Sequence, residues 1–254
     1  MSRDGNRSAH SIFANTGASE IFPTPLWILD LKHGVHEPLN RSLRSRIDDL
    51  LTPRPSIGIG IPLQTDPILH TVEEFGDLLS IVRNAVSATL DSLDTDHEGF
   101  EITGFWATVN PTGAFNSSRN HPNNYLSGVY YVATPPNSGN IEFVAPRLQA
   151  SSIVPAIKRR NKFNSNSVSL DLKPGRLVLF PAWPVYSVRV NQSLGDRITI
   201  SFNAMFTDFG TRMPKPLWTK GTVPIPHRAE PRDEWLMPAV ADKNDRKSTG
   251  GPDS

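Results

Sequence analysis

Histidine is the side chain best suited to acid–base catalysis at neutral pH and to binding transition metals, and this sequence contains seven. They are scattered along the chain, and none belongs to a His-x-Asp pair, a common arrangement of two iron ligands. The seven are His10, His33, His36, His70, His97, His121 and His227. Their spacing alone therefore indicates no metal site.

Other common catalytic patterns are also missing from the sequence. There is no P-loop, no Gly-x-Ser-x-Gly nucleophile elbow and no His-Glu-x-x-His zinc motif. Gly58-Ile59-Gly60 lacks the third glycine and the helix of a dinucleotide-binding fingerprint. The absence of cysteine excludes disulfides, thiolate nucleophiles, iron–sulfur clusters and cysteine-ligated zinc.

Two segments before residue 100 show the periodicity of amphipathic helices. Apolar residues at helical spacing predict a helix over about residues 39–51 and a second over 71–92. Thr71 and Glu74 have the spacing of a capping box at the start of the second helix. The stripe of the first consists of Leu39, Leu43, Ile47 and Leu50. Both apolar stripes require a sheet or another helix to cover them.

From residue 100 the periodicity changes to that of β-strands. The predicted strands are 100–109, 125–133, 140–144, 168–172, 177–180, 186–190 and 197–206, separated by turn signals. An apolar segment at 21–29, containing two prolines, fits an edge strand. So many short strands without alternating helices favour a mainly β, jelly-roll fold with flanking α-helices. We expect a flexible N-terminus at 1–19, one β domain at 20–206 and a Pro-rich, partly disordered extension at 207–254.

The overall charge and hydropathy limit the partners. Lys and Arg number 26 against 25 Asp and Glu, so no global basic field indicates nucleic acid. No apolar run reaches the roughly 18 residues of a membrane span, and the first twenty residues lack the apolar core of a signal peptide. These features predict a soluble, cytoplasmic protein that binds neither nucleic acid nor membrane.

A series of linked segments carries the most specific signal. The segments are 106–110, 116–122, 126–132, 136–139, 143–147, 175–183 and 197–203. In this order they resemble a bacterial and phage family of 2-oxoglutarate/iron(II) oxygenases. That family has a Phe-x-Thr-Pro strand, Asn-x-x-His-x-His-Pro, Ser-Gly-Val-Tyr-Tyr, and Phe-Pro-Ser-Trp-x-x-His before Arg-Ile-Ser-Ile-Ser-Phe-Asn. The resemblance covers about residues 20–206 and implies a double-stranded β-helix, a jelly-roll of the cupin type.

The resemblance implies a cosubstrate site on the last strand. Such enzymes hold the distal carboxylate of 2-oxoglutarate with an arginine, whose planar fork of donors suits bidentate binding. Arg197, followed by Thr199, matches that position, and Tyr131 and Asn116 are expected to bind the cofactor with them. The alternative is a structural arginine paired with a nearby acid.

The iron ligands of the family do not carry over. The first histidine position holds Arg119, the distal one holds Tyr186, and only the second histidine of the pair remains, as His121. An arginine has no lone pair to offer a cation, and a phenol is a poor ligand for iron(II) at neutral pH. The usual iron site is therefore expected to be lost, with His121 at most as a remaining ligand. Either Arg119 and Arg197 face one anion-binding cavity, or Arg119 points to solvent and Tyr186 fills the space.

Three functions remain open. The first is an oxygenase-fold protein without the iron reaction that binds a small anionic metabolite or 2-oxoglutarate, or partners an active oxygenase. The second is a working 2-oxoglutarate-dependent dioxygenase with a non-standard metal site. The third is a metal-independent isomerase or cyclase that uses His121, Arg119 and Tyr186 as catalytic groups. A homodimer is compatible with each of them.

The segment 151–167 is an insertion rich in basic residues. It carries Lys158, Arg159, Arg160 and Lys162. Such a loop would either clamp an anionic substrate or lie on the surface in contact with water.

Overall fold

The computed structural model describes residues 17–55, 58, 60–147, 152–153 and 155–209. The chain divides into two units, Met1–Arg212 and Met213–Ser254, and every described residue belongs to the first. Most of the predicted flexible N-terminus and of the C-terminal extension lies outside the described residues. Among the described helices, none is long and apolar enough to cross a bilayer.

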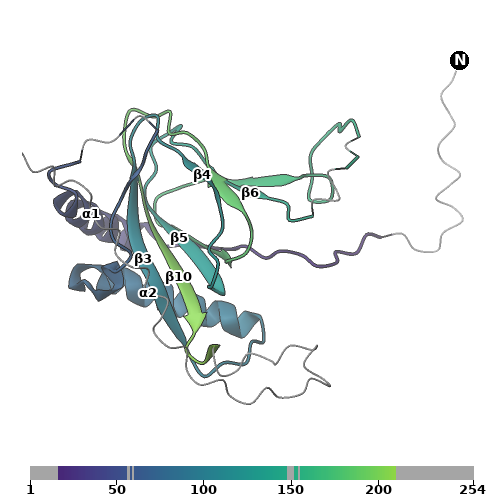
Figure 1. Cartoon of the computed structure of the whole chain (residues 1–254), viewed down its shortest axis with the longest axis horizontal. Coiled ribbons are helices and arrows are strands. Elements are labelled where there is room, and N and C mark those ends of the chain that lie inside the picture. Colours follow the sequence, from purple (N-terminus) through teal and green to yellow (C-terminus); the bar gives the residue numbers. More distant parts are fainter. Residues whose placement is uncertain (1–16, 56–57, 59, 148–151, 154, 210–254) are drawn as a thin grey trace, which may run out of the picture. The chain divides into compact units, whose positions relative to one another are not determined.

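Two antiparallel sheets form the body of the first unit (Figure 1). The large sheet contains β1 (Trp27–Asp30), β2 (Leu63–Gln64), β3 (Phe100–Asn110), β5 (Leu126–Ala133), β8 (Arg176–Pro181) and β10 (Arg197–Phe206), in the order β1-β8-β5-β10-β3-β2. The small sheet contains β4 (Asn116–Arg119), β6 (Ile141–Val144), β7 (Ser167–Leu170) and β9 (Tyr186–Val188), in the order β4-β9-β6-β7. The predicted jelly-roll fold is confirmed. The edge strand expected within 21–29 is β1, which pairs with β8 alone.

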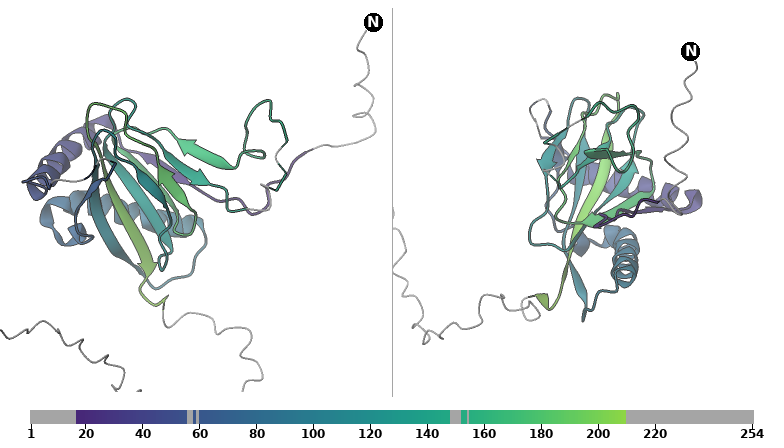
Figure 2. Two further views of the ribbon diagram at one scale, coloured as in Figure 1. Left: turned by 45° about the horizontal axis from the view of Figure 1, so that its top comes forward. Right: turned by 90° about the vertical axis from the view of Figure 1, so that its right-hand side faces the viewer.

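Both helices lie on one face of the large sheet, away from the small sheet (Figure 2). Helix α1 (His33–Leu50) begins six residues before the predicted start and continues through Pro38. Helix α2 (Gly76–Ser92) begins later than predicted, because two short 3-10 turns, Leu69–Thr71 and Glu73–Phe75, precede it. The Thr71 hydroxyl donates to the carbonyl of Ile68 at 2.8 Å, so the expected capping box does not form.

The large sheet has two different faces because successive strand residues point to opposite sides. On β10, Ile198, Ile200 and Phe202 are fully buried against the helices. The helices contribute apolar side chains to the same core: Leu43, Ile47, Leu78, Val82, Val86 and Leu90. Of the stripe predicted for the first helix, Leu39, Leu43 and Ile47 pack in this core, whereas Leu50 is exposed. The alternate residues of β10 point toward the small sheet.

One polar contact ties α1 to the sheet. Asn40 is only 9% exposed, and its amide nitrogen donates to the carbonyl oxygen of Val132 at 2.9 Å. The Tyr130 hydroxyl donates to the side-chain oxygen of Asn40 at 2.7 Å. Both polar atoms of this buried amide are therefore satisfied, which offsets the cost of its desolvation.

Gly128 allows the helix-side core to close around β5. A side chain here would begin 2.2 Å from the ring of Phe202, its partner on β10. Only a glycine therefore permits this approach of the ring to the β5 backbone.

Candidate functional site

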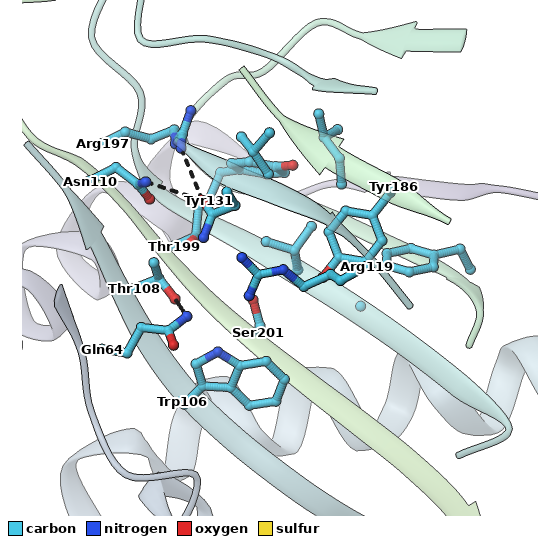
Figure 3. Close-up of a pocket in the computed structure, with 16 residues that line it drawn as sticks. Gln64, Trp106, Thr108, Asn110, Arg119, Tyr131, Tyr186, Arg197, Thr199 and Ser201 are labelled. Atoms are coloured by element: carbon cyan, nitrogen blue, oxygen red, sulfur yellow. Dashed lines mark hydrogen bonds between the residues drawn. The ribbon is translucent and has the colours of Figure 1, made fainter. Parts of the chain in front are cut away.

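A cavity of about 40 Å³ lies between the two sheets (Figure 3). The residues around it are Gln64, Trp106, Thr108, Asn110, Asn116, Arg119, Gly128, Val129, Tyr131, Ile141, Phe180, Tyr186, Val188, Arg197, Thr199 and Ser201. Two are arginines, and none is acidic. The lining therefore carries two formal positive charges with no balancing carboxylate of its own.

The pairing of β3 with β10 creates one wall. The register places Arg197 opposite Asn110, Thr199 opposite Thr108 and Ser201 opposite Trp106. Because directly opposed residues share a face of the sheet, these six side chains form three polar or aromatic pairs along the wall. Tyr131 joins them from β5, opposite Thr199.

The opposite wall depends on an irregular strand. Asn116 and Arg119 are three residues apart on β4, a spacing that would place them on opposite faces of a regular strand. The register of β4 with β9 shifts between them, and both side chains line the cavity. Such a bulge re-aims a side chain without ending the strand. Arg119 is thereby opposed to Tyr186.

Arg197 is a buried cation held by backbone oxygens. It is 1% exposed, and its Nη1 lies 2.6 Å from the carbonyl oxygen of Ser138, 3.2 Å from that of Gly139 and 3.3 Å from that of Arg189. Its Nη2 lies 3.5 Å from Oδ1 of Asn116, a long contact. No carboxylate pairs with Arg197 among the described residues. A guanidinium has five N–H donors, and three of these four contacts are made by Nη1. Arg197 therefore keeps donors for a further acceptor.

The charge states of Arg197 and Tyr131 follow from burial. Burial lowers the pKa of Arg197 to about 10, and the neighbouring Tyr131 opposes this shift. The guanidinium therefore stays charged at neutral pH. Burial raises the pKa of the Tyr131 phenol, against the influence of Arg197. Tyr131 is therefore a neutral hydrogen-bond donor at physiological pH.

His121 is hydrogen-bonded through both ring nitrogens. Its Nε2 lies 2.7 Å from the hydroxyl of Tyr186, and its Nδ1 lies 3.3 Å from the amide nitrogen of Asn203. The Asn203 oxygen accepts from the hydroxyl of Ser127 at 2.7 Å, which directs the amide nitrogen toward the histidine. An amide nitrogen only donates, so Nδ1 accepts and the proton of the neutral ring lies on Nε2. The Tyr186 oxygen accepts a hydrogen bond from this N–H, so the hydroxyl hydrogen of Tyr186 can point to another acceptor.

Both members of this pair are neutral at pH 7. Burial lowers the pKa of His121, and the positive charge of Arg119 adds to the effect. Burial raises the pKa of Tyr186 to about 12, while Arg119 opposes that rise. Arg119 and Arg197 are therefore the charges of the cavity.

Arg119 points into the cavity rather than into solvent (Figure 3). Its Nε donates to the carbonyl oxygen of Ser117 at 3.2 Å, and no acidic side chain pairs with it in the described part of the chain. One hydrogen bond holds a long side chain weakly, since a net hydrogen bond stabilises by about 1 kcal/mol. The guanidinium can therefore move when a ligand enters.

The structure brings the predicted site residues together. Six of the seven line the cavity, namely Arg119, Tyr186, Arg197, Thr199, Tyr131 and Asn116. His121 reaches the site through the hydroxyl of Tyr186. Asn110, Trp106, Thr108, Ser201 and Gln64 were not predicted as site residues. The signal that could have found most of them is the alternation of β3 and β10, because polar side chains there recur at every second position.

The basic insertion does not reach the cavity. Lys158, Arg159 and Arg160 do not line it, and Arg159 and Arg160 are exposed. Lys162 forms an ion pair with Glu20. The surface-loop interpretation of 151–167 fits its described residues better than a clamp over this site.

Within the described residues, no three His, Asp or Glu side chains gather in a group that could hold a metal ion. The three positions that match iron ligands in the resembling family do lie together, as Arg119 opposite Tyr186 and His121 bonded to Tyr186. They present one cation, one phenol and one imidazole with both nitrogens engaged.

Comparisons with known proteins agree with the fold. Residues 104–203 match the model of a family described as "Putative 2OG-Fe(II) oxygenase". No protein of curated function matches the chain significantly in sequence.

Three solved structures are similar to the chain in fold. The non-haem α-ketoglutarate-dependent epimerase SnoN from nogalamycin biosynthesis has a TM-score of 0.54 and 13% identity, over 72% of this chain and 79% of that one. EvdO2 from Micromonospora carbonacea var. aurantiaca has a TM-score of 0.53 and 17% identity, over 72% and 86%. HygX from Streptomyces hygroscopicus, with nickel and 2-oxoglutarate bound, has a TM-score of 0.50 and 12% identity, over 72% of this chain and 83% of that one. Residues 104–203, the region that matches the family model, thus resemble 2-oxoglutarate/iron(II) oxygenases, and the similar structures share the fold of this chain.

Proposed function

We propose that this protein binds a small dicarboxylate in the cavity between its sheets, without the iron(II) site of its family. The observation that carries the proposal is the buried Arg197, charged at neutral pH and without an acidic partner among the described residues. A buried charge is costly unless it is paired. A ligand carboxylate would supply the missing partner, and 2-oxoglutarate, which HygX binds, is one member of that class.

The second arginine indicates a second anionic group. Arg119 enters the cavity from the opposite sheet, so an anion with a charge at each end can contact both guanidinium groups. The remaining 40 Å³ holds only a few water molecules. Binding therefore requires Arg119 to move aside and to follow the ligand as it enters.

The residues at the family's iron position do not fit iron(II). A metal ligand needs a free lone pair, whereas the Nδ1 of His121 accepts from Asn203 and its Nε2 donates to Tyr186. Arg119 adds a positive charge beside the same position and already lowers the pKa of the imidazole. Two unit charges about 4 Å apart repel by about 4 kcal/mol at an effective dielectric constant of 20.

The test of dicarboxylate binding is thermal unfolding of the full chain with a series of diacids. At a concentration one hundred times Kd, binding stabilises by about 2.7 kcal/mol, which for a domain of this size raises Tm by roughly 5–10 °C. Arg197→Lys and Arg119→Met should each lose most of this shift. Arg83→Met, an exposed arginine on α2, is the control and should keep it. A parent protein that no diacid stabilises would refute dicarboxylate binding.

The metal part of the proposal is tested separately by anaerobic titration with iron(II). The parent should bind with Kd above roughly 100 μM, equivalent to less than about 5.5 kcal/mol. The double variant Arg119→His with Tyr186→His should bind at least about tenfold more tightly, because it offers three imidazoles at one place. Stoichiometric micromolar binding by the parent would establish a non-standard metal site and revive the dioxygenase alternative.

A further inference from the structure

Asn110 carries a buried acceptor without a partner. The residue is 1% exposed and lies at the end of β3, on the wall of the cavity. Its amide nitrogen donates to Oδ1 of Asn116 at 3.1 Å. Its own Oδ1 is buried and has no hydrogen-bond partner among the described residues. An unsatisfied buried acceptor costs about 1–3 kcal/mol, so a donor is expected to meet it.

The orientation of this amide is set by Arg197. The guanidinium Nη2 lies 3.5 Å from Asn116, and a guanidinium has only donors, so Asn116 must turn its oxygen toward it. That oxygen also faces Asn110, which must then present its nitrogen. Turning Asn110 over would bring two oxygens together. The chain from Arg197 through Asn116 therefore leaves Oδ1 of Asn110 as the unpaired atom.

The unpaired oxygen lies close to the expected carboxylate position. Asn110 and Arg197 are directly opposed on β3 and β10, and their side chains are linked through only two hydrogen bonds to Asn116. A ligand whose carboxylate binds Arg197 therefore places the adjacent carbon beside Asn110. A hydrogen-bond donor on that carbon would satisfy Oδ1.

The charge of the cavity selects among the donors. An ammonium group would lie in a site that already holds two arginines and no lining carboxylate, so repulsion opposes it. A keto group offers only lone pairs, which would face the oxygen of Asn110. A hydroxyl donates without adding charge. Of the three substituents, only the hydroxyl both donates to Oδ1 of Asn110 and avoids repulsion from the two arginines.

We propose that the ligand is a 2-hydroxy dicarboxylate, bound by Arg197 at the hydroxyl-bearing end and recognised there by Asn110. The inference rests on the proposed dicarboxylate binding and narrows it to one class. It also predicts that the 2-hydroxy acid binds more tightly than the corresponding 2-oxo acid, after which the family is named.

The test is isothermal calorimetry with four five-carbon diacids that differ only at carbon 2. These are glutarate, 2-oxoglutarate, glutamate and 2-hydroxyglutarate, the last as separate enantiomers. One enantiomer should bind at least about tenfold more tightly than glutarate or 2-oxoglutarate, a difference of about 1.4 kcal/mol. Glutamate should bind most weakly.

Two variants assign the preference to its residue. Asn110→Ala should reduce the ratio of 2-hydroxyglutarate to glutarate affinity to within about twofold of one. Asn84→Ala removes an exposed amide on α2, outside the lining of the cavity, and should leave the ratio unchanged. Because the readout is a ratio within each protein, a general loss of affinity cancels.

The outcomes separate the two proposals. If no diacid binds the parent, the proposed function fails. If glutarate, 2-oxoglutarate and both hydroxy acids bind equally, dicarboxylate binding stands and the role of Asn110 is overturned. That role is also overturned if the hydroxyl preference survives in Asn110→Ala.

Discussion

The two faces of the large sheet are built from the same strands but serve opposite requirements. Toward the helices, β10 presents Ile198, Ile200 and Phe202, all fully buried among other apolar side chains. Toward the small sheet the intervening residues are Arg197, Thr199 and Ser201, which line a cavity. One face stabilises the domain by excluding water, and the other holds polar groups around a cavity. Because successive residues of a strand point to opposite faces, β10 contributes to the core and to the cavity at once. Substitutions of neighbouring residues should therefore have different effects.

The largest contrast is expected between Phe202 and Ser201. Phe202→Ala removes a fully buried ring that packs over Gly128 and stacks with Phe105, and should lower the free energy of unfolding by about 3–5 kcal/mol. Ser201→Ala removes one partly exposed hydroxyl and should change it by less than about 0.5 kcal/mol. Urea unfolding of both variants measures the contrast. Equal losses would mean that the cavity wall is as tightly packed as the helix side.

A smaller contrast is expected between two adjacent tyrosines. Tyr130→Phe leaves the side-chain oxygen of Asn40 without its donor and should cost about 1–3 kcal/mol of unfolding free energy. The diacid affinity of this variant should stay within about threefold of the parent, because Asn40 still donates to the carbonyl oxygen of Val132 and so still holds the strand beside Tyr131. Tyr131→Phe should change stability little and weaken diacid binding about tenfold, by loss of a donor in the cavity. Denaturant unfolding gives the stability of each variant and calorimetry its diacid affinity. If Tyr130→Phe lost affinity and Tyr131→Phe lost stability, the assignment of the two faces to stability and to binding would be contradicted.

The smallest effect concerns pH. The pKa of His121 lies below that of an unfolded histidine, so the unfolded chain binds more protons in the window between the two values. The resulting contribution to stability is complete above about pH 6.5 and is lost as the pH falls through that window. The Tm of the parent should therefore drop more between pH 7.5 and pH 5 than that of His121→Gln. The other histidines are common to both proteins and cancel in the comparison. A larger drop in the variant would contradict the expected direction.

The sequence predicts the helix-covered face better than the cavity. Leu39, Leu43 and Ile47 of the predicted stripe pack in the core, although Leu50 is exposed, and the strand predicted at 197–206 is β10. The predicted start of α2 was wrong because the Thr71–Glu74 spacing lies in two 3-10 turns rather than in an α-helix. The spacing of two residues does not distinguish these conformations, because side chains three residues apart lie near each other in both. Only the backbone hydrogen bonds differ, spanning three residues in a 3-10 turn and four in an α-helix.

The cavity was predicted through likeness to a family, and only partly. One of the two alternatives drawn from that likeness placed Arg197 and Arg119 at one cavity, and both line it. Asn110 was missed, since its importance depends on an unpaired atom that appears only when Asn116 and Arg197 are in position. Strand β4 was not predicted either, because its residues are mostly polar. A bulge then decides which of them face inward.

The contact of Asn40 with the sheet extends the influence of the site beyond its lining. Asn40 holds the carbonyl of Val132 and the hydroxyl of Tyr130, the residues on either side of Tyr131. The bond to the backbone of Val132 fixes the strand next to Tyr131, and with it the direction of the Tyr131 side chain. Natural selection for ligand affinity would therefore act on a helix that never touches the ligand. Two proteins with identical cavity linings could still differ in affinity if one of them lacked an amide at this position of α1.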